Sequence, residues 1–301
     1  MTDETGNRKS PVPGEPSPPR YSEFRRVVHI FFQRKLAVFG LIIIFILVFT
    51  AIFAPWLAPY DPYKMSMRDQ LQHPSAKHLL GTDGLGRDTL SRVIYGTRTS
   101  LIVGITAVFI SAVIGQTMGL VAAHFGGLTY ALIMRFTDAL MSIPMLLNAL
   151  IVAGLLGGGL KNVIIALAVG GLSIHCRMMC GQAMAIKQNE YIMAGISMGS
   201  SNLRLMFRHI FPNAFPPLLV VISIGLGTAI LAEAALSFLG IGIVPPTCAW
   251  GSMINEGYKY LRIHPVLSIA PGLATMIVVF GFNMLGDGLR DSLDPRLRGT
   301  L

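Results

Sequence analysis

Apolar residues are grouped along the chain into long runs, and shorter polar stretches separate these runs. Six runs are expected to be transmembrane helices: 36–56, 100–123, 139–160, 162–186, 213–240 and 265–286. Each run is long enough to cross the roughly 30 Å of hydrocarbon in a bilayer. A helix also satisfies its own backbone hydrogen bonds in lipid. The pattern therefore predicts an all-α polytopic membrane protein.

Composition supports this interpretation and narrows the possible classes of protein. The 301 residues are 52% hydrophobic and 13% charged, with a mean hydropathy of +0.61, whereas an average soluble chain carries about 25% charged residues. The formal charge of +9 does not indicate a nucleic-acid partner, because the basic residues lie in scattered loops without an aromatic-interleaved stripe. Basic cytoplasmic loops explain the excess charge.

The charge of the loops predicts the orientation. Lys and Arg number 15 in the stretches assigned to the cytoplasm (1–35, 124–135, 177–213 and 287–301) and nine in those assigned outside (57–98, 158–161 and 241–266). Both termini are therefore expected in the cytoplasm. The run 36–56 exceeds the length of a typical signal-peptide apolar region and is expected to be a retained helix.

The expected organisation has five parts. Residues 1–35 form a basic cytoplasmic segment whose first 20 residues, rich in Pro, Gly and Ser, are expected to be disordered. A peripheral first helix (36–56) and a mixed-charge extracytoplasmic loop (57–98) follow. The core with five transmembrane helices covers 99–290, and 291–301 form a cytoplasmic tail.

The longest cytoplasmic loop of the core, 187–212, is too polar to cross a bilayer but has helical periodicity. Its apolar residues recur at helical intervals: Tyr191, Ile192, Ile196, Leu203, Phe207 and Ile210. We expect two short amphipathic helices that meet near Gly199, where glycine permits a positive φ.

Several sequence blocks in this order resemble one family. Glu190-Tyr191-Ile192-Met193-Ala194-Gly195, with Gly199 and His209-Ile210-Phe211-Pro212-Asn213, resembles the cytoplasmic "EAA" loop of binding-protein-dependent ABC importer permeases. Three further blocks are similar to the dipeptide/oligopeptide/nickel branch and to its second permease subunit: Leu80-Gly81-Thr82-Asp83 with Gly86-Arg87-Asp88, Ser237-Phe238-Leu239-Gly240 with Trp250-Gly251, and Gly286-Asp287-Gly288-Leu289-Arg290-Asp291 with Leu293-Asp294-Pro295.

The resemblance implies a type I importer permease in the inner membrane of a prokaryote that moves di- or oligopeptides, with nickel or another metal chelate as the alternative. It also implies four partners: a homologous second permease, two cytosolic ATPases and an extracytoplasmic binding protein. The sequence alone also allows a homodimer. ATPase contact would involve the following residues of the loop: Glu190, Tyr191, Met193, Ala194, Gly195, Gly199 and Leu203. Met193 stands where the family motif has Glu, and Gly195 where it has its second Ala.

Catalytic motifs are not found in the sequence. No Gly-Lys-Ser/Thr follows a glycine loop, and neither a His-Glu-x-x-His nor a Gly-x-Ser-x-Gly pattern occurs. We therefore expect that the chain is not an enzyme and binds no cofactor, and that partner subunits bind ATP and Mg²⁺. A self-contained channel or secondary transporter is the competing class, which predicts internal repeats; the two halves show none.

Ionisable residues within the predicted helices are candidates for function. Glu233, with Ser237 one turn later, is either a carboxylate in the translocation path or a helix-packing hydrogen-bond partner. Asp138 is expected to pair with Arg135, and Arg177 to extend its head toward the cytoplasmic surface.

Cysteine, histidine and tryptophan residues give weaker signals. His175, Cys176 and Cys180 can be drawn as a soft-metal site, but burial is the commoner role of such cysteines, and no metal is expected. Trp250 is expected at the membrane interface of the extracytoplasmic mouth.

Overall fold

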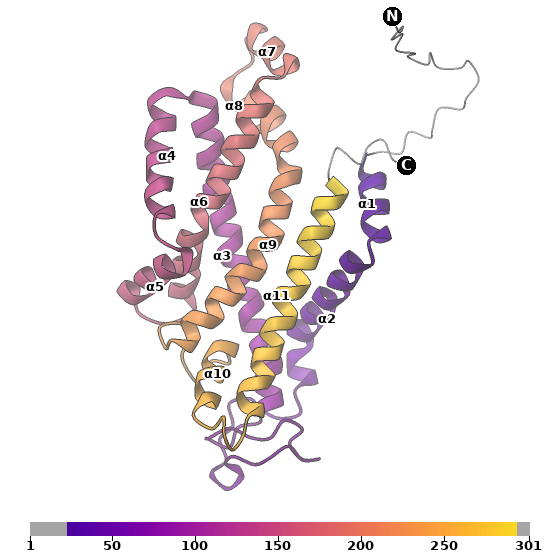
Figure 1. Ribbon diagram of the computed structural model, residues 1–301, viewed down its shortest axis with the longest axis vertical. Coiled ribbons are helices and arrows are strands. Elements are labelled where there is room, and N and C mark those ends of the chain that lie inside the picture. The colour runs from indigo at the N-terminus through magenta and orange to yellow at the C-terminus, as the bar shows by residue number, and fades with distance from the viewer. Residues whose placement is uncertain (1–22, 294–301) are drawn as a thin grey trace, which may run out of the picture.

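The computed structural model describes residues 23–293, and most of that part is helical (Figure 1). The elements in chain order are α1 (Glu23–Gln33), α2 (Lys35–Leu57), the 3₁₀ turn η1 (Met67–Asp69), α3 (Thr89–Phe125), α4 (Gly127–Met141), α5 (Met145–Leu156), α6 (Leu160–Lys187), α7 (Glu190–Ser197), α8 (Asn202–Arg204), the π-helical η2 (Leu205–Ile210), α9 (Phe211–Phe238), α10 (Trp250–Tyr258) and α11 (Val266–Leu293). Residues 1–22 and 294–301, which include all of the predicted disordered tail (1–20) and most of the C-terminal tail (291–301), lie outside the described part.

Within residues 23–293, five helical segments are long and apolar enough to cross a membrane: α2, α3, α6, the continuous stretch Asn202–Phe238, and α11. The predicted all-α fold is confirmed. The uninterrupted helix expected over 139–160 is not found, because α4 and α5 form a pair bent by 89°; counted as one broken span, this pair brings the number of spans in residues 23–293 to six. Pro144 lies in the break with an extended backbone. A proline disfavours helical geometry in the residue before it, so an uninterrupted apolar run did not mean an uninterrupted helix.

The two helices at the centre, α3 and α6, approach each other closely along a row of small residues. A Cβ atom added to Gly115 would lie 2.5 Å from Leu172 O, and one added to Gly119 would lie 2.2 Å from Cys176 O. Glycines four residues apart on one helix face let two backbones meet in lipid, where apolar burial gives little net attraction between helices. This contact is the core of the bundle.

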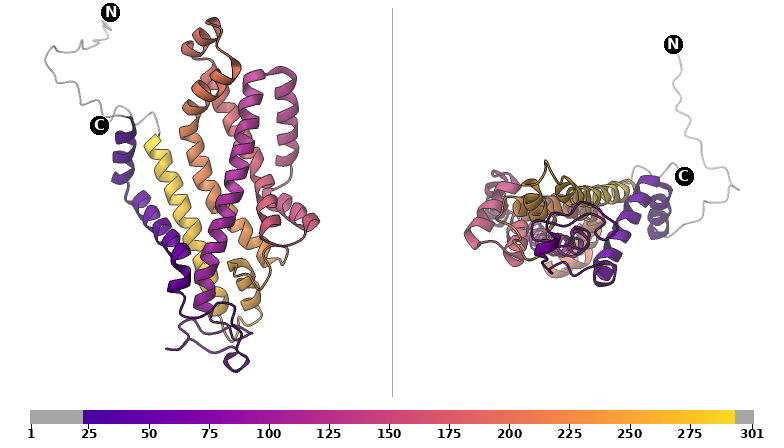
Figure 2. Two further views of the ribbon diagram at one scale, coloured as in Figure 1. Left: turned by 180° about the vertical axis from the view of Figure 1, so that it is seen from behind. Right: turned by 90° about the horizontal axis from the view of Figure 1, so that it is seen from below.

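The first membrane helix, α2, lies at one edge of the bundle beside α11 (Figure 2). Only 22% of its most apolar window is buried, against 39–50% for the other candidate spans. Its contact with α11 is also made through small residues, because a Cβ added to Gly40 would lie 2.9 Å from Gly281 O. Most of the surface of α2 is thus left for lipid.

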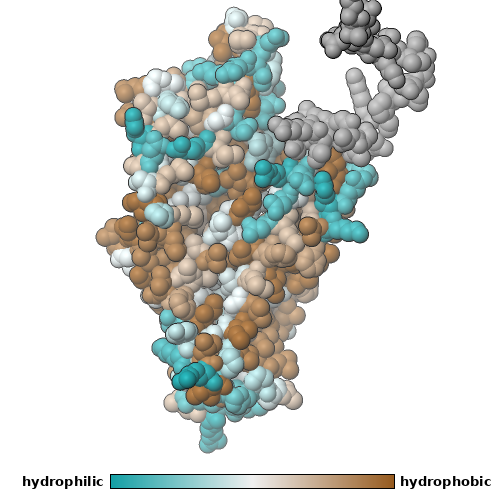
Figure 3. All heavy atoms as spheres, viewed as in Figure 1, coloured by the Kyte–Doolittle hydropathy of each residue, from teal (hydrophilic) through white to brown (hydrophobic). Residues whose placement is uncertain are grey.

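Two polar ends lie on either side of a predominantly apolar middle zone (Figure 3). One end carries α7 and the termini of α3 and α6, and we refer to it as the α7 end. The other carries α10 and the loop of residues 58–88, and we refer to it as the α10 end. Candidate functional groups are found at both ends.

Candidate functional site

At the α7 end the chain forms a compact helical projection beyond the bundle (Figure 1). Only Gln188 and Asn189 separate α6 from α7. On its inner side, α7 packs through Ile192, which is buried in a cluster with residues of α6 and η2. Gly195 is buried as well, and a Cβ there would lie 3.2 Å from Leu205 Cδ2. The projection is therefore attached to the bundle by apolar contacts.

The turn after α7 has the geometry expected from its glycine. Gly199 has φ +76°, and its N–H donates to Ile196 O at 2.9 Å. Ser200 N–H donates to Gly195 O at 3.0 Å. These two bonds form a Schellman motif, which ends a helix with a residue in the left-handed region. The predicted turn near Gly199 is thus present and follows the short helix α7, but the second helix is not short, because it continues into the membrane.

Beyond the turn, the chain is helical without interruption into the membrane. Residues Asn202–Phe238 form one helical stretch of 37 residues, which includes α8, η2 and α9. After α8 the stretch is π-helical over Leu205–Ile210, and Pro212, which has no N–H to donate, follows two residues later. Because α6 and α9 both reach the projection, a displacement of α7 acts on both helices.

The outer face of the projection is apolar although it lies at a polar end of the molecule. Large side chains there have the following exposed fractions: Tyr191 48%, Met193 51%, Ile196 49%, Met198 80%, Leu203 69% and Phe207 51%. Glu190, Ala194 and Gly199 are also exposed. Large exposed apolar side chains gathered at a polar end are typical of a protein contact site. Of the predicted ATPase-contact residues, only Gly195 faces inward.

Glu233 lies on α9 with its side chain fully buried. One carboxylate oxygen accepts a hydrogen bond from Ser237 Oγ at 2.8 Å, and the other accepts one from Ser100 Oγ of α3 at 3.3 Å. Ser237 Oγ in turn accepts from Ile243 N at 2.9 Å. The carboxyl group therefore links α9, α3 and the turn after α9. These contacts agree with Glu233 as a helix-packing hydrogen-bond partner, one of the two alternatives predicted from the sequence. A role of Glu233 in the translocation path stays a prediction.

A groove of about 630 Å³ lies on another face of α9, between α9 and α11. Its walls are mainly apolar, with Ala234, Ala235 and Phe238 on one side and Met276 and Phe280 on the other. Two polar side chains of α11, Thr275 and Asn283, also line it. Glu233 does not line this groove, although its neighbour Ala234 does.

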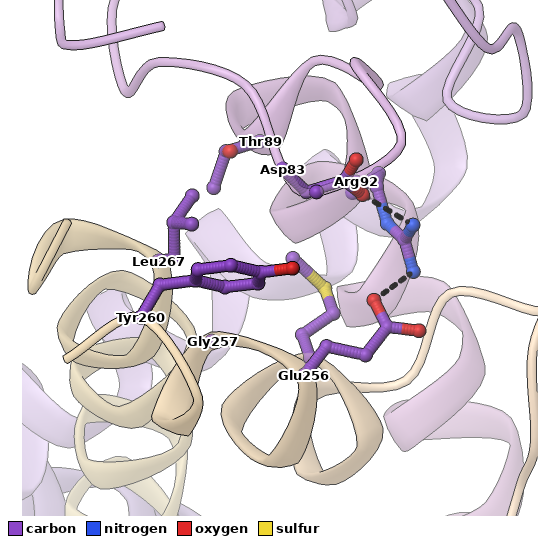
Figure 4. Close-up of a pocket in the computed structure, with 9 residues that line it drawn as sticks. Asp83, Thr89, Arg92, Glu256, Gly257, Tyr260 and Leu267 are labelled. Atoms are coloured by element: carbon purple, nitrogen blue, oxygen red, sulfur yellow. Dashed lines mark hydrogen bonds and ion pairs between the residues drawn. The ribbon is translucent and has the colours of Figure 1, made fainter. Parts of the chain in front are cut away.

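At the α10 end, ion pairs connect the loop of residues 58–88 to the helical bundle (Figure 4). Asp83 accepts hydrogen bonds from Arg87 Nε at 2.6 Å and from Arg92 Nη1 at 2.7 Å. Arg87 Nη2 donates to Glu256 of α10 at 2.9 Å. Both guanidinium groups are almost fully buried. Burial raises the pKa of Glu256, and the Arg87 charge opposes that shift only in part.

Asp88 stabilises the start of α3. Its carboxylate accepts from Ser91 N and Ser91 Oγ, and it pairs with His78 Nδ1 at 2.8 Å. An aspartate in this position satisfies an N–H group that a helix leaves unpaired in its first turn. The mixed charge of residues 57–98 had indicated a folded loop. The role of Glu256 in the charged cluster could not be predicted, because its partner Arg87 is distant in sequence.

Two expectations about individual side chains need correction. Trp250 is not at the membrane interface: it is fully buried and donates from Nε1 to Val93 O at 3.0 Å, with its ring against Gly96. Asp138 pairs with Arg177 and not with Arg135, since α4 folds back beside α6.

The cysteines and the histidine of α6 are packed inside the protein. His175, Cys176 and Cys180 are all buried, and the residues around them are mainly those of the contact with α3. Within residues 23–293, no group of three or more His, Cys, Asp or Glu side chains is arranged to hold a metal ion. The position of the two cysteines agrees with burial as small apolar groups.

Comparison with known proteins gives matches over nearly the whole chain. Residues 115–299 match the family described as "Binding-protein-dependent transport system inner membrane component", and residues 22–74 match the "N-terminal TM domain of oligopeptide transport permease C". The dipeptide transport system permease protein DppC of Alkalihalophilus pseudofirmus is 39% identical over 293 residues, which cover 96% of each chain. The glutathione transport system permease protein GsiD of Escherichia coli is 40% identical over 270 residues, which cover 89% of each.

The fold is also similar to that of a solved structure. The MetNI methionine ABC transporter in an inward-facing conformation has a chain that superposes with a TM-score of 0.55 at 20% sequence identity. The match covers 67% of this chain and 96% of that one. At this level of identity the match concerns the arrangement of helices alone.

Proposed function

The chain belongs to the family of binding-protein-dependent transport system inner membrane components, and we propose that it is a permease subunit of an ATP-driven importer of di- or oligopeptides. Two similar proteins are named as dipeptide and glutathione permeases. Glutathione is itself a small peptide, so both names support a peptide-type substrate. The family is a permease component, and the chain is accordingly a transport subunit and not the ATP-hydrolysing one.

The observation that supports this function best is the apolar outer face of α7 and α8. Exposed Tyr191, Met193, Ile196, Met198 and Leu203 would fit a groove on a cytosolic ATPase subunit. ATP and Mg²⁺ would then be bound by that subunit. Closure of a pair of ATPases would push α7, and α6 and α9 would carry the movement into the membrane, because both are continuous with the projection.

This assignment places the α7 end in the cytoplasm. The loop charges favour the same orientation, with both termini inside. The α10 end would then face a binding protein that delivers the peptide. The groove between α9 and α11 would face a homologous second permease, and the translocation path would lie between the two subunits.

Reconstitution of the complete importer in lipid tests the function. The chain is combined with the second permease, the ATPases and the binding protein encoded beside it, and ATP hydrolysis is measured with dipeptides, oligopeptides, glutathione or Ni²⁺ chelates. Dipeptides or oligopeptides should stimulate hydrolysis and accumulate inside the vesicles. Stimulation by nickel chelates alone would contradict the peptide assignment, and transport without any ATPase would contradict an importer of this class.

Contact with the ATPase is tested separately by cross-linking. Met193→Cys places a thiol on the exposed face of α7, and Leu155→Cys is the matched control on exposed α5. The native cysteines are all buried and contribute little background. The Met193→Cys chain should form a cross-link with the ATPase, in a yield that changes with nucleotide. Equal yields at both positions would contradict docking at α7.

A further inference from the structure

A pocket of about 460 Å³ lies where α2 ends at the α10 end, and the importer mechanism makes no use of it. Tyr60, Asp61 and Tyr63 line it from the segment after α2, and Tyr95 lines it from the second turn of α3. Three prolines, Pro55, Pro59 and Pro62, complete the walls. Because proline fixes φ, this short segment is stiff and the pocket is largely preformed.

The pocket combines a free carboxylate with aromatic rings. Asp61 is exposed, and its Oδ1 accepts from Tyr63 N at 2.8 Å. Asp61 makes no ion pair with any residue in the described range 23–293. The Tyr60 hydroxyl donates to Lys77 O at 2.8 Å, and its ring packs against His78 with centroids 4.8 Å apart, so the rings of Tyr63 and Tyr95 are the main ones left for a ligand. A carboxylate next to tyrosine rings is suited to an ammonium cation.

The adjoining surface of α2 is suited to an acyl chain. Phe49, Phe53 and Trp56 are exposed and stack in a row, with ring centroids 4.5 Å and 5.5 Å apart. Trp56, exposed over 78% of its surface, lies within two residues of the helix end and beside the pocket-lining Pro55. Tryptophan near the end of a membrane helix marks the level of the lipid headgroups. The row thus ends next to the pocket-lining Pro55, although its three rings do not themselves line the pocket.

From this arrangement we propose that the Tyr60–Asp61–Tyr63–Tyr95 pocket binds the ammonium headgroup of a membrane phospholipid, whose acyl chain lies along Phe49, Phe53 and Trp56. The Asp61 charge selects an ammonium lipid over an anionic one. Lys64, the exposed residue directly after Tyr63, supplies a positive charge in the same segment for the lipid phosphate. Bound lipid would attach the peripheral helix α2 to the loop of residues 58–88.

The test measures lipid retention by the intact importer complex. The complex is purified in mild detergent and equilibrated with an equimolar mixture of phosphatidylethanolamine and phosphatidylglycerol that have the same acyl chains, and bound lipids are counted by native mass spectrometry. Wild type should retain an excess of phosphatidylethanolamine. Asp61→Asn should lower the ratio of the two lipids about three- to tenfold, because a cation in contact with a carboxylate and aromatic rings loses its charge partner.

Two further variants separate the aromatic contribution from structural damage. Tyr95→Leu removes an aromatic ring from the pocket and should lower the lipid ratio. Tyr95→Phe keeps the ring and loses no side-chain hydrogen bond to a described residue, so it should keep the wild-type ratio. Asp287→Asn and Tyr130→Leu are matched controls at exposed positions of the α7 end and should leave the ratio unchanged.

Four outcomes would overturn the proposal. The first is an equal ratio in wild type and Asp61→Asn. The second is an equal loss in Tyr95→Phe and Tyr95→Leu, which would indicate a packing role. The third is an Asp61→Asn complex that keeps the wild-type lipid ratio but binds the extracytoplasmic binding protein more weakly. That result would assign the pocket to protein docking. A dipeptide at millimolar concentration should not displace the lipid, and displacement would also contradict a lipid site.

Discussion

Arg87 Nη2 lies 2.9 Å from Glu256 Oε2, although 169 residues separate the two in sequence. This contact joins the loop after the first membrane helix to α10, which follows α9. Asp83 and Arg92 complete the cluster, in which two buried guanidinium groups face two carboxylates. Removal of one member leaves a buried charge with an incomplete set of partners, which is costly.

Glu256→Ala should therefore lower stability more than Glu256→Gln. Alanine leaves the Arg87 guanidinium without its partner on α10, which is expected to cost about 1.5–3 kcal/mol. Glutamine keeps a carbonyl oxygen that can accept from Arg87, so it should cost less than half as much. The midpoint of thermal unfolding of the purified complex measures the difference. Equal midpoints for the two variants would show that the hydrogen bond contributes little.

The same residue should give stability a pH dependence. Burial raises the pKa of Glu256 above its usual 4.5. A carboxyl group with a higher pKa in the folded state contributes most to stability below pH 4.5, and this contribution falls as pH rises through the folded pKa. The unfolding midpoint of wild type should thus decrease more between pH 4.5 and 7 than that of Glu256→Gln. A steeper decrease in the variant would contradict the direction of the shift.

Glu233→Gln should keep most of the transport activity. Glutamine can occupy the same space and can still accept from Ser100 or Ser237, so the link between α9 and α3 is largely kept. Glu233→Ala leaves both hydroxyls without that acceptor and opens a cavity, at a cost of about 2–4 kcal/mol. Uptake of labelled dipeptide per inserted chain measures the effect. Normal insertion without uptake in Glu233→Gln would instead place the carboxylate in the translocation path.

Gly119→Ala should disrupt the centre of the bundle. The added Cβ would lie 2.2 Å from Cys176 O, so α3 and α6 would have to separate, and a cost of about 1–3 kcal/mol is expected. Gly181→Ala on α6 is the control, because a Cβ there meets nothing within 4 Å. It should be neutral or slightly stabilising, since alanine favours a helix more than glycine does. The yield of monodisperse protein and its unfolding midpoint report both effects.

Features set by local chemistry could be predicted from the sequence, and features set by distant contacts could not. The lengths of apolar runs gave the membrane helices, and a glycine between two amphipathic segments gave the turn at Gly199. The partner of Arg87 depends on how α10 packs, which no local pattern encodes. The bend near Pro144 could not be predicted from the apolar run, because hydropathy does not depend on backbone geometry.

Two errors show how packing overrides a general preference. Tryptophan favours membrane interfaces, but Gly96 provides space for the Trp250 ring and Val93 O accepts its N–H, so the ring is buried. Asp138 has a basic neighbour one turn away, yet the fold brings Arg177 to it from another helix. In both cases the decisive partner lies far away in sequence.

Gly199→Asp should abolish transport and leave the chain inserted. Aspartate tolerates a positive φ better than most residues, and a Cβ at this position meets nothing within 4 Å, so the turn should be kept. The new carboxylate would lie beside the exposed apolar face of α7 and α8, where an ATPase subunit is proposed to dock. A charge that is desolvated there without a partner opposes docking. Dipeptide uptake and peptide-stimulated ATP hydrolysis should both fall to background.

Gly199→Asn separates charge from backbone strain. Asparagine has nearly the same shape as aspartate and also tolerates a positive φ, but it has no charge. It should retain part of the transport that Gly199→Asp loses, at equal amounts of inserted chain. An equal loss in both variants would indicate that the turn itself had changed. Wild-type uptake by Gly199→Asp would mean that no protein surface packs against this turn, because a buried, unpaired carboxylate at a subunit contact could not be so well tolerated.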